Sequence, residues 1–85
     1  MREMKYVIKD PLGMHARPAG MLVKAVVPYL SKITVSAPGG TADARHLMAL
    51  MRLAAKQGTE LTIIIEGDDE DKAAIELQAF LSANL

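Results

Sequence analysis

The spacing of the apolar residues constrains the fold more than any other feature, because it changes repeatedly between two periods along the 85 residues. Residues 3–9 alternate apolar with polar side chains, as in a half-buried strand. In residues 16–27 the apolar positions instead fall at i, i+3, i+4 and i+7, which predicts an amphipathic helix. Pro28 ends this helix, because the residue before a proline is driven out of the α region.

Three more strands are expected further along the chain. Residues 33–36 and 41–43 are predicted to pair as a hairpin, because residues 37–40 between them, Ala-Pro-Gly-Gly, carry the side chains of a tight turn. Residues 59–67, TELTIIIEG, make the strongest predicted strand, since their apolar side chains alternate over most of the segment.

Two more helices complete the predicted order. Residues 46–53, HLMALMRL, indicate a short helix, and the acidic residues 68–71 indicate the start of a last one, because carboxylates stabilise the positive end of a helix. The predicted buried stripe of that last helix is Ala73, Ala74, Leu77, Phe80 and Leu81. The order β-α-β-β-α-β-α favours an α+β fold, a four-stranded sheet with all helices on one face, in a single domain over residues 1–85.

The composition excludes several classes of protein. Ten Lys and Arg balance ten Asp and Glu, and a zero net charge argues against a general nucleic-acid binder. The absence of Cys excludes disulfides and thiolate metal sites. No apolar run approaches the roughly 20 residues of a membrane-spanning helix, and the charged first residues do not resemble a signal peptide. We therefore expect a soluble, cytoplasmic protein without membrane insertion.

The stretch GMHARPAG, residues 13–20, places an imidazole, a fixed positive charge and a proline at the start of the first predicted helix. His15 stands where an N-cap would, so the unpaired N–H groups of the first turn and the helix dipole form an anion site. Ala16, Arg17 and Pro18 make up this phosphate-cradling turn. The Arg17 guanidinium can fork onto phosphate oxygens, and the missing N–H of Pro18 costs nothing in a first turn.

An imidazole beside an anion site can carry a phosphoryl group. Neutral His is a nucleophile at physiological pH, and it can attack a phosphoryl donor to form a phosphohistidine. The positive charge of Arg17 disfavours the imidazolium form and stabilises the attached phosphoryl group. The alternative interpretation of His15 is a surface residue or helix cap with no chemistry, and the local spacing does not decide between the two.

The segment resembles the active-site signature of the histidine-containing phosphocarrier proteins, the HPr family of the sugar phosphotransferase system. That signature is Gly, an aliphatic residue, His, Ala or Thr, Arg and Pro. It is matched here by Gly13, Met14, His15, Ala16, Arg17 and Pro18. The resemblance runs over essentially the whole chain, including RHLMALMRLA and QGTELTIIIEGDDEDKA.

The resemblance implies a phosphoryl relay on an open-faced β-sandwich with an antiparallel sheet. Enzyme I, phosphorylated from phosphoenolpyruvate, would pass its phosphoryl group to Nδ1 of His15, and His15 would hand it to the IIA domain of a sugar permease. Arg17 would stabilise the phosphoryl group. The protein would be a carrier and not an enzyme, would need no cofactor or metal, and would be a monomer, because a relay exchanges partners quickly.

The short helix raises the question of a docking surface. In proteins of the family it flanks the active site and binds Enzyme I and IIA domains, and flexible Met side chains suit surfaces with several partners. The expected partner-docking residues are Met21, Lys24, Leu47, Met48, Met51 and Arg52. Arg45 is expected to keep this face basic. His46 stands where the family usually has a serine that a kinase modifies, so that regulation is in doubt here.

Two other functions remain open at this point. The chain could be a regulatory module of the same family, for a nitrogen branch or for carbon regulation, that signals by its phosphorylation state. A small nucleic-acid or metal-binding domain is disfavoured by the absence of Cys-x-x-Cys, by only three aromatic residues and by the zero net charge.

Overall fold

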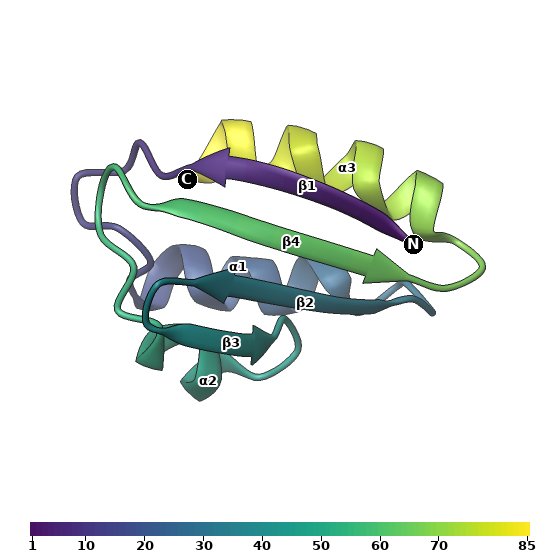
Figure 1. Cartoon of the computed structure of the whole chain (residues 1–85), viewed down its shortest axis with the longest axis horizontal. Coiled ribbons are helices and arrows are strands. Elements are labelled where there is room, and N and C mark those ends of the chain that lie inside the picture. Colours follow the sequence, from purple (N-terminus) through teal and green to yellow (C-terminus); the bar gives the residue numbers. More distant parts are fainter.

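A computed structural model describes all residues, 1–85. It confirms the predicted order of strands and helices. The elements are β1 (Arg2–Val7), α1 (Ala16–Val26), β2 (Lys32–Ala37), β3 (Gly40–Asp43), α2 (Leu47–Arg52), β4 (Glu60–Glu66) and α3 (Glu70–Asn84). Figure 1 shows the sheet as one layer, with α1 and α3 behind it and α2 beside β3.

The four strands form one antiparallel sheet in the order β1-β4-β2-β3. The last strand in sequence, β4, therefore lies inside the sheet, between β1 and the β2–β3 hairpin (Figure 1). Arg2 is opposite Ile65 in the β1–β4 pair, and Lys32 is opposite Glu66 in the β2–β4 pair. The expected four-stranded antiparallel α+β architecture is confirmed.

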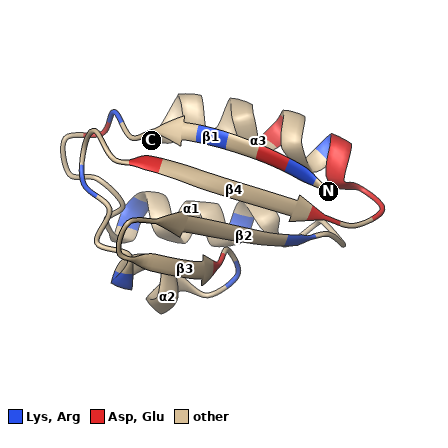
Figure 2. Cartoon of the chain, in the orientation of Figure 1, with Lys and Arg blue, Asp and Glu red and all other residues tan.

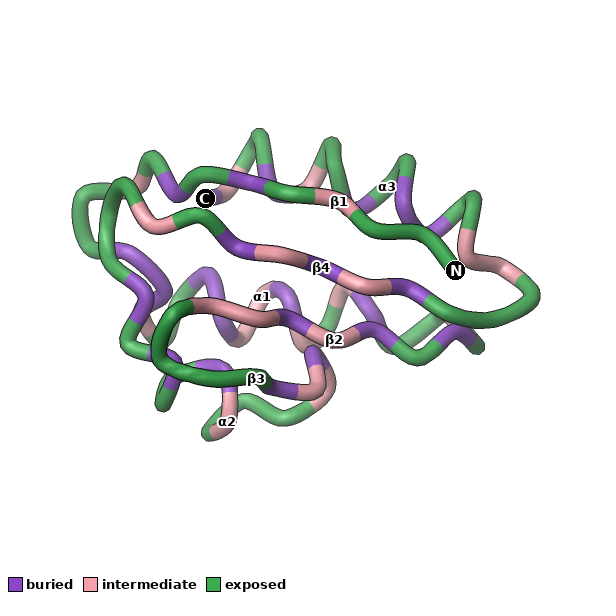
Figure 3. The backbone as a smooth tube through the Cα atoms, in the orientation of Figure 1, coloured by how far each residue is buried: buried purple, intermediate pink, exposed green.

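The core lies between the sheet and the helices. Along β4 the side chains alternate between buried and partly exposed, which is the pleat of a strand covered on one face (Figure 3). The buried apolar residues form a single cluster of 21, drawn from the sheet, all three helices and the loop before α1. The apolar spacing of the sequence thus identified the covered face correctly, although Phe80 of the predicted α3 stripe is only half-buried.

Most element boundaries differ from the predicted ones by one or two residues. β1 ends at Val7 and not at residue 9, because the N–H groups of Lys9 and Asp10 turn away from the sheet to the carbonyl of Leu85. α1 ends at Val26, one residue before the predicted end. α2 begins after His46, whose backbone is extended, and ends before Leu53, so that it has six residues and not eight.

Two side chains from distant parts of the sequence hold the connection between α1 and β2. The Arg45 guanidinium donates to the carbonyls of Val26, Tyr29 and Ser31 at the C-terminal end of α1. The Asp69 carboxylate accepts hydrogen bonds from the N–H groups of Leu30 and Ser31 and from the Ser31 hydroxyl. The Arg45 guanidinium is therefore bonded to the backbone of this connection, and the expectation that its charge keeps the docking face basic stays a prediction.

Candidate functional site

The start of α1 has the geometry of an anion site. His15 is the N-cap, with an extended backbone at φ −89° and ψ 179°, and its side chain does not cap the helix. The first N–H group bonded within the helix is that of Ala19, which donates to the His15 carbonyl at 3.1 Å. The N–H groups of Ala16 and Arg17 have no partner in the protein, and Pro18 has no N–H. Two donors and the positive end of the helix dipole are therefore free to meet an anion.

Pro18 shapes this turn but donates no hydrogen bond to an anion. Pro18 is buried, with no N–H to donate, and its fixed φ favours a first helical turn. Arg17 is exposed, and no carboxylate of the protein holds its guanidinium. Of the three residues predicted to cradle phosphate, Ala16 and Arg17 can donate hydrogen bonds, whereas Pro18 serves by position.

Gly13 fixes the loop that presents His15. Its φ is +69°, and a Cβ at this position would lie 2.3 Å from the carbonyl oxygen of Ala55. That same oxygen accepts the N–H of Met14 at 2.8 Å. The loop before the histidine is therefore pressed against the chain that follows α2, and only a residue without a side chain allows this contact.

Asp10 is a site residue that the sequence reasoning missed. Its Oδ1 accepts the N–H of Leu12 at 2.8 Å, and its Oδ2 lies 3.5 Å from Nε2 of His15. The Leu12 N–H is the main reason why the pKa of the Asp10 carboxyl is lowered, and the His15 and Arg17 side chains lower this pKa further. In the sequence Asp10 directly follows the alternating residues 3–9, and that pattern gives it no functional role. The available signal was a carboxylate followed by a Pro-Leu-Gly turn, which folds the chain back toward His15.

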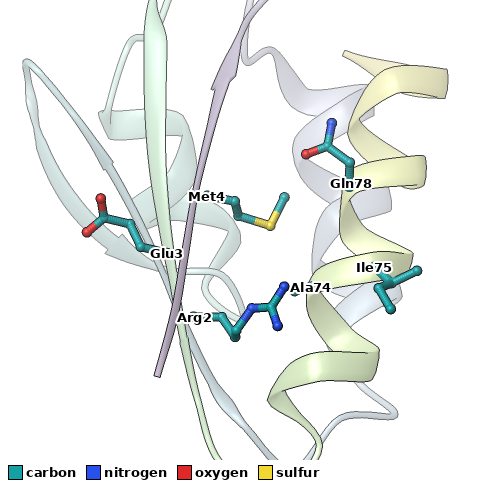
Figure 4. Close-up of a pocket in the computed structure, with 6 residues that line it drawn as sticks. All are labelled: Arg2, Glu3, Met4, Ala74, Ile75 and Gln78. Carbon is teal, nitrogen blue, oxygen red and sulfur yellow. The ribbon is translucent and has the colours of Figure 1, made fainter.

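The imidazole is reachable from solvent. The His15 side chain is 30% exposed and the Asp10 side chain 25% exposed. None of the hollows on the surface is lined by His15 or Arg17. The hollow of about 330 Å³ between β1 and α3, lined in part by Met4 and Ile75, lies elsewhere (Figure 4). A site this open suits a group delivered by another protein and does not enclose a small substrate.

A second surface lies on the neighbouring short helix. α1 and α2 pack against each other, and three apolar side chains of α2 remain exposed, Leu47 at 39%, Met48 at 61% and Met51 at 37%. Leu50 of the same helix is fully buried. We call Leu47, Met48 and Met51 the α2 patch.

Charged residues lie beside this patch. Lys24 on α1 and Arg52 at the end of α2 are exposed, while Met21 is half-buried. α1 carries Arg17 and Lys24 and α2 ends in Arg52, whereas acidic residues gather where α3 begins (Figure 2). His46 is exposed, its side chain does not cap α2, and no group of three His, Asp or Glu is placed to hold a metal ion. None of the three helices combines the length and the apolar character that crossing a membrane requires.

Comparison with known proteins agrees with this geometry. Residues 2–83 match the family model described as the PTS HPr component phosphorylation site. The phosphocarrier protein HPr of Lysinibacillus sphaericus is 39% identical over 82 residues, which span 96% of this chain and 93% of that protein. The crystal structure of HPr-C-His from Thermoanaerobacter tengcongensis superposes with a TM-score of 0.91 at 32% identity, over 99% of this chain and 94% of that one.

The chain is also similar to a protein described in regulatory terms. The Bacillus subtilis catabolite repression containing protein Crh superposes with a TM-score of 0.76 at 32% identity, over 100% of this chain and 98% of that one. That structure is described as an intertwined dimer with a swapped domain.

These matches define a small phosphoryl carrier of the phosphotransferase system, a class whose partners are Enzyme I and IIA domains. The chain belongs to the HPr family. It is a phosphocarrier and not an enzyme. The matches confirm the family, the fold and the phosphocarrier function that the sequence predicted.

Proposed function

We propose that His15 is the residue that accepts the phosphoryl group from Enzyme I and passes it to the IIA domains of sugar permeases. The observation that carries this proposal is the position of a solvent-accessible imidazole at a helix start whose first two N–H groups have no partner. A phosphoryl group on the ring would receive those two hydrogen bonds and the favourable end of the α1 dipole. Arg17 supplies a cation that can fork onto its oxygens.

The α2 patch is proposed as the surface on which the partners dock, with Met21, Lys24 and Arg52 around it. Three exposed apolar side chains on a helix of six residues are more than its own packing needs, since Leu50 already anchors it in the core. Adaptable Met side chains suit one surface that must accept two different partners in turn. Lys24 and Arg52 would steer acidic surfaces toward it.

Phosphoryl transfer from Enzyme I tests the acceptor. The protein is incubated with Enzyme I and labelled phosphoenolpyruvate, beside His15→Ala and His46→Ala. Acid-labile, base-stable label that is lost only in His15→Ala is the expected result, and adding a IIA domain then tests the second transfer. Label that survives in His15→Ala and disappears in His46→Ala would identify His46, just before α2, as the phosphoryl acceptor.

The docking surface is tested separately. Met48→Ala combined with Met51→Ala should slow transfer from Enzyme I while leaving the circular dichroism spectrum and the melting temperature nearly unchanged, because both side chains are largely outside the core. Ile75→Ala is the matched control, since Ile75 is an exposed apolar residue on α3, at 69% exposure. Equal transfer rates for the wild type and the double variant would rule out the α2 patch.

A regulatory module of the same family is the second candidate, and the likeness to Crh supports it. Such a module would accept little or no label from Enzyme I, although it folds normally. The exposed His46 at the start of α2 cannot serve a serine kinase as an acceptor, which weighs against that form of regulation.

We further propose a single domain over residues 1–85 that acts in the cytoplasm as a monomer. Sedimentation would detect a dimer directly.

A further inference from the structure

We propose that Asp10 is a positioning residue for phosphoryl transfer, whose carboxylate holds the proton of the His15 ring on Nε2, presents Nδ1 to the donor and stabilises the charge that the ring acquires. This inference rests on the proposed role of His15 as the acceptor. It concerns the segment that leads into His15 and α1, Asp10-Pro11-Leu12-Gly13-Met14.

The geometry fixes which ring nitrogen faces the carboxylate. Oδ2 of Asp10 lies 3.5 Å from Nε2 of His15, within ion-pair range. A neutral imidazole has one N–H and one lone pair, and a carboxylate favours the tautomer that turns the N–H toward it. The proton therefore stays on Nε2, and Nδ1 keeps the lone pair that attacks phosphorus.

The carboxylate is itself held in place and is not a freely moving surface group. Its other oxygen, Oδ1, accepts the Leu12 N–H at 2.8 Å, and the Asp10 carbonyl accepts the Gly13 N–H at 2.9 Å. The Asp10 N–H donates to the Leu85 carbonyl at 2.8 Å. The residue is thus bonded through its side chain and through both backbone groups, as a residue that orients another one requires.

The charge changes during transfer explain why a carboxylate is useful there. The Nδ1 lone pair forms the N–P bond while the bond from phosphorus to the donor atom breaks, and its electron pair stays with the donor. The proton on Nε2 does not move, so the ring becomes formally cationic beside the Asp10 carboxylate. When the IIA domain takes the phosphoryl group, the N–P electron pair returns to Nδ1 and the ring is neutral again.

The charged side chains that act on the Asp10 carboxylate are those of His15 and Arg17. Arg17 follows in the first turn of α1, the backbone of Lys56 lies against Gly13, and Leu85 reaches Asp10 through its carbonyl. Arg and Lys keep their charge throughout the pH range in which an imidazole titrates. A change in the titration of the phosphorylated ring after substitution of Asp10 therefore reports on Asp10.

The test compares Asp10→Asn with the wild type and with Asp68→Asn. The Asn side chain keeps an acceptor for the Leu12 N–H but loses the charge. Asp68 is an exposed carboxylate outside the site, so its substitution matches the change in net charge. Asp10→Ser is a second variant that also retains an acceptor for that N–H. Circular dichroism verifies folding, and two readouts follow. One is the midpoint of the phosphoimidazole titration by phosphorus NMR. The other is the equilibrium of phosphoryl transfer with Enzyme I.

The expected result in Asp10→Asn is a midpoint lower by about half to one pH unit. The transfer equilibrium should shift about three- to tenfold away from the phosphorylated carrier. Nitrogen chemical shifts of the unphosphorylated ring should show a loss of the Nε2–H tautomer. If the titration midpoint and the transfer equilibrium are unchanged in both Asp10 variants while His15 is still labelled, the role of Asp10 is overturned and the proposed function is not. Equal shifts in Asp68→Asn would also overturn it, whereas no label on wild-type His15 would overturn the proposed function as well.

Discussion

Substituting Arg45 by Met should destabilise the protein far more than substituting Arg52 by Met, although Arg45 lies just before α2 and Arg52 is its last residue. The Arg45 guanidinium donates to the carbonyls of Val26, Tyr29 and Ser31. The Val26 carbonyl keeps a second partner, the Tyr29 N–H at 3.1 Å, so two carbonyls lose their only protein donor. Removing a hydrogen bond from the charged guanidinium and leaving its carbonyl without a partner lowers the free energy of unfolding by about 1 kcal/mol or more. For the two carbonyls together the expected loss is about 2–3 kcal/mol.

That loss is large for a domain of 85 residues, whose total stability is expected to be about 4–13 kcal/mol. It corresponds to a melting temperature lower by about 10–20 °C. Urea denaturation followed by circular dichroism measures it as a lower midpoint at an unchanged slope. Arg52 is exposed with no such bonds, so Arg52→Met should change stability by less than about 0.5 kcal/mol and act, if at all, on transfer rates. Equal midpoints for the two variants would refute this account of Arg45.

Three further predictions concern single residues. Gly13→Ala should cost at least about 1–2 kcal/mol and slow phosphoryl acceptance, because the new Cβ meets the Ala55 carbonyl at a positive φ; a wild-type urea midpoint would contradict this. Ala54→Gly should raise stability by about 1 kcal/mol, since Ala54 has a φ of +50° just after α2, and an unchanged or lower midpoint would count against it. The Ser31 hydroxyl, more than the Leu30 N–H, lowers the pKa of the Asp69 carboxyl below its ordinary 3.8. Asp69 therefore stabilises the fold above that pH and loses its contribution as the pH falls through the folded-state pKa. The melting temperatures of the wild type and Asp69→Asn should differ at pH 7 and converge in acid, and a constant difference would contradict the assignment.

The parts of the structure that depend on nearby residues could be predicted from the sequence. The alternation in TELTIIIEG predicts a strand covered on one face, and β4 has that burial pattern. The GMHARPAG motif predicts a helix beginning after a histidine, and α1 begins at Ala16. The exposure of Met48 and the burial of Leu50 follow from their places on opposite sides of a short helix.

The parts that depend on distant residues could not be predicted in the same way. Arg45 looks like any surface arginine in the sequence, and only the folded chain brings it to the carbonyls of Tyr29 and Ser31. Asp69 suits the start of α3, yet its carboxylate bonds the loop before β2 and does not cap its own helix. The side chain of Asp10 reaches His15 only because the intervening turn closes, and turn geometry sets that distance.

The position of β4 inside the sheet has a consequence for synthesis on the ribosome. β1 and β2 do not pair with each other, since each of them pairs with β4, the last strand to be made. The loop before His15 also depends on residues that are synthesised late. The backbone of Ile8 forms hydrogen bonds with Gly58 and Thr59, and the Asp10 N–H donates to Leu85. A nascent chain that ends before these residues can form the β2–β3 hairpin and α1, but it lacks the contacts that hold the loop before His15. We therefore expect the loop that presents His15 to reach its final conformation only after α3 has been synthesised.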